Sequence, residues 1–143
     1  MNPRGGRSLA PKAARAGAPT DINDIAGAVE ALGWERIGAG LDESGVAPAG
    51  AVLSPELCAE LVAGFDDGTR FRSTVDMARH RFGAGVYRYF GYPLPAVVEA
   101  LRQALWPHLL PMAREWAERR NQPAPWDDAL DDWLARCHPP ARG

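Results

Sequence analysis

The 143-residue sequence predicts an α+β fold that is mostly helical and contains one β-hairpin. Three observations lead to this fold class. Apolar residues recur at helical spacing in several separate segments. The triplet Ser54-Pro55-Glu56 offers the capping hydroxyl, the first-turn proline and the early acid that begin a helix. Residues 72–77 and 86–90 look extended, and the glycine-containing segment between them can turn the chain.

The first ordered elements are predicted to be two short helices followed by an extended arm. Residues 20–33 have apolar side chains at helical spacing, with a polar cap at the start. Residues 34–45 repeat the pattern, and Gly45 is placed to end this second helix. Residues 46–53 are apolar enough for a strand. Because Pro48 disfavours a central strand, an edge strand or an extended arm is expected.

The remaining helices are predicted from apolar stripes and prolines. One helix follows Ser54, and another begins after the hairpin near residue 96. Pro107 is expected to interrupt that helix, and a new one is expected to start near Pro111. A last helix is predicted from about Asp127 to the cysteine at position 137. Both cysteines of the chain fall in apolar stripes, so buried free thiols are expected.

The hairpin is predicted to have two unlike faces. In the second strand, Val86, Arg88 and Phe90 share one face, while Tyr87 and Tyr89 share the other. A lone hairpin is marginally stable in water, so this one is expected to require further strands as partners. The sequence contains no other strongly predicted strand that can supply them.

Net charge and hydropathy predict a limited set of partners. The formal net charge is −2, which disfavours nucleic acid as a partner, and no apolar run approaches the length of a bilayer span. Residues 1–19 carry only basic charges among glycines, prolines and alanines, and they are predicted to form a disordered basic tail. Residues 20–143 then form one unit. The absence of a signal-peptide pattern predicts a cytoplasmic protein.

No metal site or catalytic residue is predicted within the chain. The three histidines, His80, His108 and His138, are not followed by the acid of a His-x-Asp or His-x-Glu motif, and no zinc-protease motif occurs. The hairpin instead supplies candidate substrate-binding residues, because an arginine beside phenols can hold a carboxylate. These candidates are Arg79, His80, Tyr87, Arg88 and Tyr89. The alternative is that the tyrosine rings cover a core edge while the arginine head groups stay in water.

Three stretches resemble a known enzyme family: "LSPELC", "FDDGTRFRSTVDMARHRFGAGVYRYFGYPLP" and "LARCH". From Leu41 to His138 the chain resembles the bacterial prolyl-4-hydroxylase-like group of Fe(II)/2-oxoglutarate-dependent dioxygenases. The resemblance implies a jelly-roll (double-stranded β-helix) enzyme that uses iron, 2-oxoglutarate and O₂ to hydroxylate a C–H bond. In that family the metal triad follows the region that is matched here, so no residue of this chain is assigned to it.

The resemblance therefore implies that residues 20–143 are the helical and hairpin N-terminal portion of such an oxygenase, without the catalytic jelly-roll core. The chain alone is expected to be inactive and to bind neither Fe(II) nor 2-oxoglutarate. Its substrate stays unknown, and its expected partners are the missing C-terminal half or a second copy of itself. The alternative is a stand-alone protein-interaction module that uses the Arg/Tyr hairpin to pair with another sheet edge.

Overall fold

A computed structural model of the protein describes residues 17–81 and 83–138. The predicted disordered tail, residues 1–19, lies almost wholly outside these residues. Within them the chain is mostly helical and has one two-stranded antiparallel hairpin, as predicted. A jelly roll is not formed by the described residues.

The elements follow one another in an order that places the hairpin between the third and fourth helices. The helices are α1 (Ile25–Glu30), α2 (Trp34–Ser44), α3 (Pro55–Ala63), α4 (Ala96–Arg119) and α5 (Leu130–Cys137). The strands are β1 (Phe71–Asp76) and β2 (Val86–Phe90). Short 3₁₀ turns cover Ile22–Asp24, Gly64–Asp66, Gly68–Arg70 and Met77–His80. Residues 46–53 form no strand, so the extended-arm alternative is the one observed.

Local sequence signals position the helix ends as expected. The Asp21 carboxylate accepts a hydrogen bond from the backbone N–H of Asn23 ahead of α1. The Ser54 hydroxyl accepts one from the backbone N–H of Leu57 at 3.2 Å and caps α3. Gly45 ends α2 with a φ of 76°, a left-handed conformation that glycine adopts without a steric penalty.

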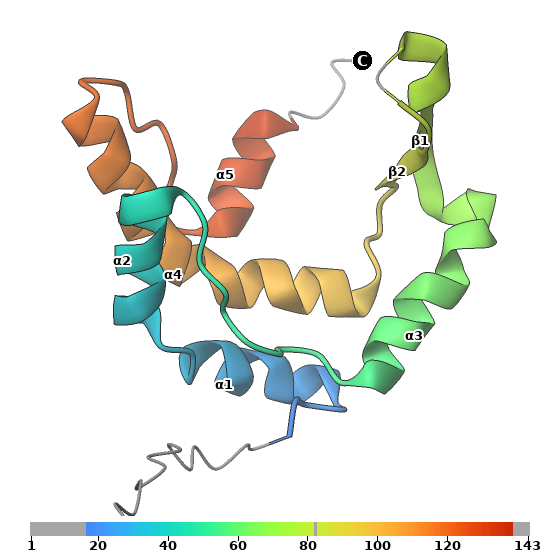
Figure 1. The fold of residues 1–143 in the computed structure, drawn as a ribbon, viewed down its shortest axis with the longest axis horizontal. Coiled ribbons are helices and arrows are strands. Elements are labelled where there is room, and N and C mark those ends of the chain that lie inside the picture. Colours follow the sequence, from blue (N-terminus) through green and yellow to red (C-terminus); the bar gives the residue numbers. More distant parts are fainter. Residues whose placement is uncertain (1–16, 82, 139–143) are drawn as a thin grey trace, which may run out of the picture.

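The main core lies where α1, α3 and α4 meet. Ile25 and Val29 of α1 are fully buried against Leu57 of α3 and Val97 of α4. Figure 1 shows α1 running beneath α4. In the same view α3 and the hairpin lie on the side of the N-terminal end of α4. α5 lies on the other side of α4 from α1. The residues of this core come from the helices and the segments next to them, and the core includes no residue of the hairpin strands.

The prediction of a helix break near Pro107 is wrong, because α4 continues through both Pro107 and Pro111. Each proline removes one backbone hydrogen bond and bends a helix, and Figure 1 shows α4 changing direction along its length. Packing compensates for this loss, since Leu110 and Ala117 beyond the first proline are buried. Among the helices of the described residues, α4 included, none is long and apolar enough to cross a membrane.

A polar contact ties the far end of α4 to α2. The Trp116 indole N–H donates to the Asp42 carboxylate at 2.6 Å, and the Arg119 guanidinium donates to the same carboxylate at 3.1 Å. The indole hydrogen bond, followed by that of Arg119, lowers the pKa of Asp42 below its ordinary value of 3.8. Burial opposes this shift but does not cancel it. This contact fixes α2 against the second half of α4.

The predicted burial of the two cysteines is also wrong. Cys58 on α3 and Cys137 on α5 are both free and exposed. Each lies in an apolar stripe of the sequence, but α3 and α5 each bury only one side chain below the surface, Leu57 and Leu130 respectively. Other residues of the two stripes, such as Leu61 and Leu134, are only partly buried, and neither cysteine is covered by the elements of the described residues.

Candidate functional site

The first candidate surface is the face of the hairpin that carries Tyr87 and Tyr89. The two rings meet edge to face, with centroids 5.6 Å apart and planes at 80°, and their residues are 43% and 48% exposed. The Arg72 guanidinium lies 5.5 Å from the centre of the Tyr89 ring. Antiparallel pairing of Val75 with Tyr87 and of Ser73 with Tyr89 fixes this arrangement. We call Arg72, Tyr87 and Tyr89 the tyrosine face.

The tip of the hairpin is basic. The 3₁₀ turn Met77–His80 places Arg79 and His80 in solvent, and Arg81 follows in the left-handed region with a φ of 59°. Asp76 accepts a hydrogen bond from the backbone N–H of Ala78 and makes a loose ion pair with Arg79 at 3.8 Å. The Arg79 side chain is nevertheless 83% exposed, so its charge remains available to a partner.

The opposite face of the hairpin is aromatic and partly buried around Arg88. The Arg88 guanidinium lies 4.7 Å from the centre of the Phe65 ring and 5.3 Å from that of Phe71. One guanidinium N–H donates to the Phe65 carbonyl oxygen at 2.5 Å, while Nε is buried without a partner in the described residues. Phe71 stacks on Phe90 across the strands. We call Phe65, Phe71, Val86, Arg88 and Phe90 the Arg88 face.

The structure therefore does not gather the five candidate residues into one site. Tyr87 and Tyr89 lie together, Arg79 and His80 lie at the tip, and Arg88 points to the other face. Alternation along the second strand predicts this separation of Arg88 from the tyrosines. Arg72, which joins the tyrosines, is absent from the predicted set. The position of Arg72 over Tyr89 depends on the register of the two strands and on the irregularity between Phe71 and Ser73. The sequence of one strand does not specify either of these.

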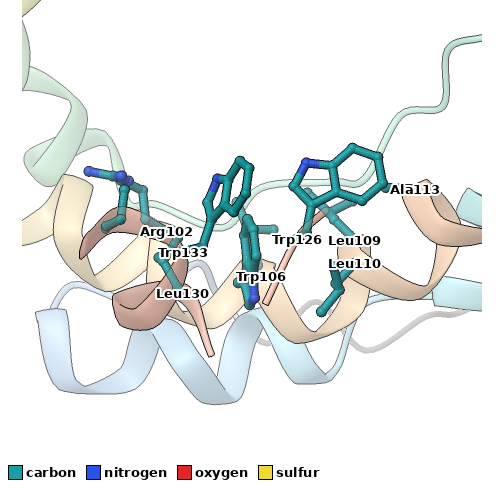
Figure 2. Close-up of a pocket in the computed structure, with 10 residues that line it drawn as sticks. Arg102, Trp106, Leu109, Leu110, Ala113, Trp126, Leu130 and Trp133 are labelled. Carbon is teal, nitrogen blue, oxygen red and sulfur yellow. The ribbon is translucent and has the colours of Figure 1, made fainter. Parts of the chain in front are cut away.

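A second feature that the sequence did not predict is an apolar pocket between α4 and α5, with a volume of about 360 Å³. We call it the tryptophan pocket, because Trp106, Trp126 and Trp133 surround it, and Figure 2 shows Trp106 of α4 between the other two rings. The remaining lining residues are Arg102, Leu105, Leu109, Leu110, Ala113, Leu130 and Leu134.

Hydrogen bonds from Trp106 and Arg114 hold the walls of the tryptophan pocket in place. The Trp106 indole N–H donates to the Asp128 carbonyl oxygen at 2.9 Å. Arg114 pairs with the Asp128 carboxylate and also donates to the Trp126 carbonyl oxygen, both at 2.8 Å. Arg102, the charged lining residue, donates to the Tyr92 hydroxyl at 3.3 Å. The lining has neither a carboxylate nor a nucleophile, so this pocket suits binding of apolar groups and not acid–base chemistry.

The histidines do not converge on a metal site. His80 lies at the hairpin tip, His108 stacks on Trp34 and pairs with Glu30, and His138 packs its ring against Tyr92. Across residues 17–81 and 83–138, no group of three His, Cys, Asp or Glu side chains is placed to hold a metal ion. An iron held by two histidines and a carboxylate therefore does not fit the residues that the structure describes.

Comparisons with known proteins add a family to this geometry. Residues 85–142, which include β2, α4 and α5, match the Oxygenase-NA family, described as an oxygenase catalysing oxidative methylation of damaged DNA. Two uncharacterized proteins from two strains of Mycobacterium tuberculosis are each 57% identical to this chain over 49 residues. These alignments cover 34% of this chain and 21% of each relative, so the chain spans about a fifth of the length of the curated relatives it matches. No solved structure matches the chain.

The family match over residues 85–142 agrees with the oxygenase part of the resemblance and corrects one prediction. Iron and 2-oxoglutarate dependence stay predictions. The prediction that nucleic acid is not a partner is wrong, because the matched family is described as acting on damaged DNA. The net charge of −2 misled because it averages over the whole chain. Residues 70–92 alone contain five arginines and one acid, so the charge of this segment is opposite in sign to that of the whole chain.

Proposed function

We propose that this chain is the N-terminal part of an Fe(II)- and 2-oxoglutarate-dependent oxygenase that acts on damaged DNA. The observation that carries the proposal is the match of residues 85–142 to an oxygenase family described by that substrate. The match includes one strand of the basic hairpin and both helices that line the tryptophan pocket. The domain that provides the iron ligands is a separate part of the complete enzyme in this proposal.

The hairpin supports the view that the described residues are one part of a larger domain. Its two strands pair only with each other, so each has an unpaired edge within the described residues. Of the eight large hydrophobic residues that are exposed in the described part of the chain, six lie between residues 62 and 92: Val62, Phe65, Val86, Tyr87, Tyr89 and Tyr92. Exposed apolar groups beside unpaired strand edges are typical of a surface that another element covers.

Turnover assays on two proteins test the proposal. The 143-residue chain is incubated with Fe(II), ascorbate, 2-oxoglutarate and a methylated oligonucleotide, and we expect no succinate above a heat-killed control. The full-length mycobacterial relative, under the same conditions, is expected to form succinate and to change the methylated base. If the relative forms the same amount of succinate with and without methylated DNA, the proposal that damaged DNA is the substrate is refuted. Enzyme-dependent succinate from the 143-residue chain would refute the assignment of the iron site to another part.

A second candidate function, a stand-alone protein-interaction module, is favoured by the Arg88 face. Its exposed Phe65 and Val86 flank an arginine whose Nε–H is buried and has no acceptor in the described residues. A buried donor of this kind is costly unless a partner supplies a carbonyl or carboxylate oxygen. The two functions differ in folding behaviour. A module folds cooperatively and stays monomeric alone, whereas part of a larger domain self-associates or unfolds without cooperativity.

A further inference from the structure

The tyrosine face combines two properties that proteins use to hold single-stranded nucleic acid. Tyr87 and Tyr89 are each nearly half exposed. A tyrosine whose only role is to fill a hydrophobic core usually has its ring covered. The two rings are held in a defined mutual geometry by the strand register and by Arg72. A base that is not stacked in a duplex can pack on such a ring whatever its identity.

Arginine side chains lie beside one of these rings and at the hairpin tip. Arg79, His80 and Arg81 form the exposed tip that continues from β1, and Arg72 lies over Tyr89. In the described residues Arg72 and Arg81 enter no salt bridge, whereas Arg70 and Arg79 each have an aspartate neighbour. Arginine side chains without an internal partner are suited to bind phosphates, and the release of counterions then favours association.

We propose that the tyrosine face and the hairpin tip bind single-stranded DNA, with bases stacked on Tyr87 and Tyr89 and phosphates held by Arg72 and Arg81. The inference rests on the proposed function, because that function supplies DNA as the substrate. The inference goes beyond the proposed function by naming the hairpin as the element that contacts the DNA strand. The Arg88 face has no part in this contact, since it lies on the opposite side of the hairpin.

Fluorescence anisotropy of the full 143-residue chain with a labelled oligothymidylate of about 15 nucleotides tests the stacking part. Tyr87→Ala and Tyr89→Ala are each expected to weaken binding about tenfold. Tyr87→Phe and Tyr89→Phe keep the ring and are expected to retain the affinity of the parent chain. Val86→Ala, a change on the same strand but the opposite face, is the matched control and is expected to change the affinity less than about twofold.

The phosphate contacts are tested by the salt dependence of the same binding reaction. Arg72→Ala and Arg81→Ala are each expected to reduce the slope of log affinity against log salt concentration by about 1. Arg36→Ala removes an exposed arginine of α2, far from the hairpin in the chain, and is expected to leave the slope unchanged. Circular dichroism of each variant shows whether the fold is retained.

Three results would overturn the inference. The first is that the parent chain binds DNA and the Tyr87→Ala and Tyr89→Ala variants bind it equally tightly, which would place the contact elsewhere. The second is equal or tighter binding of a duplex or of an RNA of matched sequence. The third is no measurable binding of any nucleic acid by the chain. None of these results refutes the proposed function, which is decided separately by succinate formation and by the change of the methylated base with the full-length relative.

Discussion

The imidazole of His108 stacks face to face on the indole of Trp34, with ring centroids 4.3 Å apart and planes that differ by 2°. This stack joins α4 to the start of α2. The Trp34 indole N–H donates to the Val29 carbonyl oxygen at 2.9 Å, and His108 Nε2 lies 2.9 Å from the Glu30 carboxylate. A single pair of rings therefore connects α1, α2 and α4.

His108→Ala is expected to lower the free energy of unfolding by about 1–2 kcal/mol, because it removes the stacking contact and leaves a gap beside Trp34. Urea denaturation measures the change. His108→Phe retains a flat ring and is expected to recover most of the loss. Glu30→Gln is expected to cost less than about 0.5 kcal/mol, because Glu30 is 77% exposed. Equal losses in the Ala and Phe variants would show that stacking is not the source of the stabilisation.

Acid stability is expected to depend on Asp42. Its pKa is lowered in the folded chain by the hydrogen bonds from Trp116 and Arg119, so its contribution is complete above its ordinary pKa of 3.8 and is lost as pH falls through the lowered value. Asp42→Asn removes that titration. The urea midpoint of the variant is therefore expected to fall less than that of the parent between about pH 5 and about pH 3.

Glu43→Gln is the matched control for Asp42→Asn, because it removes one carboxylate from the same helix at an exposed position. It is expected to leave the acid dependence as in the parent chain. An acid dependence that is unchanged in Asp42→Asn would mean that the contact between α2 and α4 does not stabilise the fold through its charge.

The cap of α3 is expected to be the most sensitive polar contact of the core. Ser54 is 1% exposed, and its hydroxyl satisfies the backbone N–H of the buried Leu57. Ser54→Ala is expected to lower the free energy of unfolding by about 1–2 kcal/mol. Ser44→Ala removes an exposed hydroxyl from α2 and is expected to cost less than about 0.5 kcal/mol. A neutral Ser54→Ala variant in urea denaturation would contradict the role of the cap.

The apolar surface around the Arg88 face is expected to drive self-association of the isolated chain. Val62 is 74% exposed in α3, three residues before Phe65 of this face, and Val46 is 70% exposed in the arm that follows α2. Val62→Lys is expected to weaken association in sedimentation velocity, because it places a charge in the contact. Val46→Lys, with the same change at similar exposure, is expected to have little effect. A parent chain that is monomeric and folds cooperatively at high concentration would favour the interaction module.

The sequence alone determined those features that depend on neighbouring residues. Ser54-Pro55-Glu56 begins α3, Gly45 ends α2, and the alternation through Val86–Phe90 separates Arg88 from the two tyrosines. Each of these depends on hydrogen bonds or backbone angles within a few residues, so the local sequence contains the information. The helix-rich fold class with one hairpin follows from the same signals.

Only the tertiary structure decided which of these local preferences prevail. Packing around Leu110 and Ala117 retains α4 through Pro107 and Pro111, although each proline locally disfavours the helix. The exposure of Cys58 and Cys137 depends on which elements cover α3 and α5. The spacing of apolar residues within one helix does not specify its neighbours. Arg72 over Tyr89, His108 on Trp34 and the tryptophan pocket all join residues distant in sequence. Such contacts exist only once register and packing bring separate elements together.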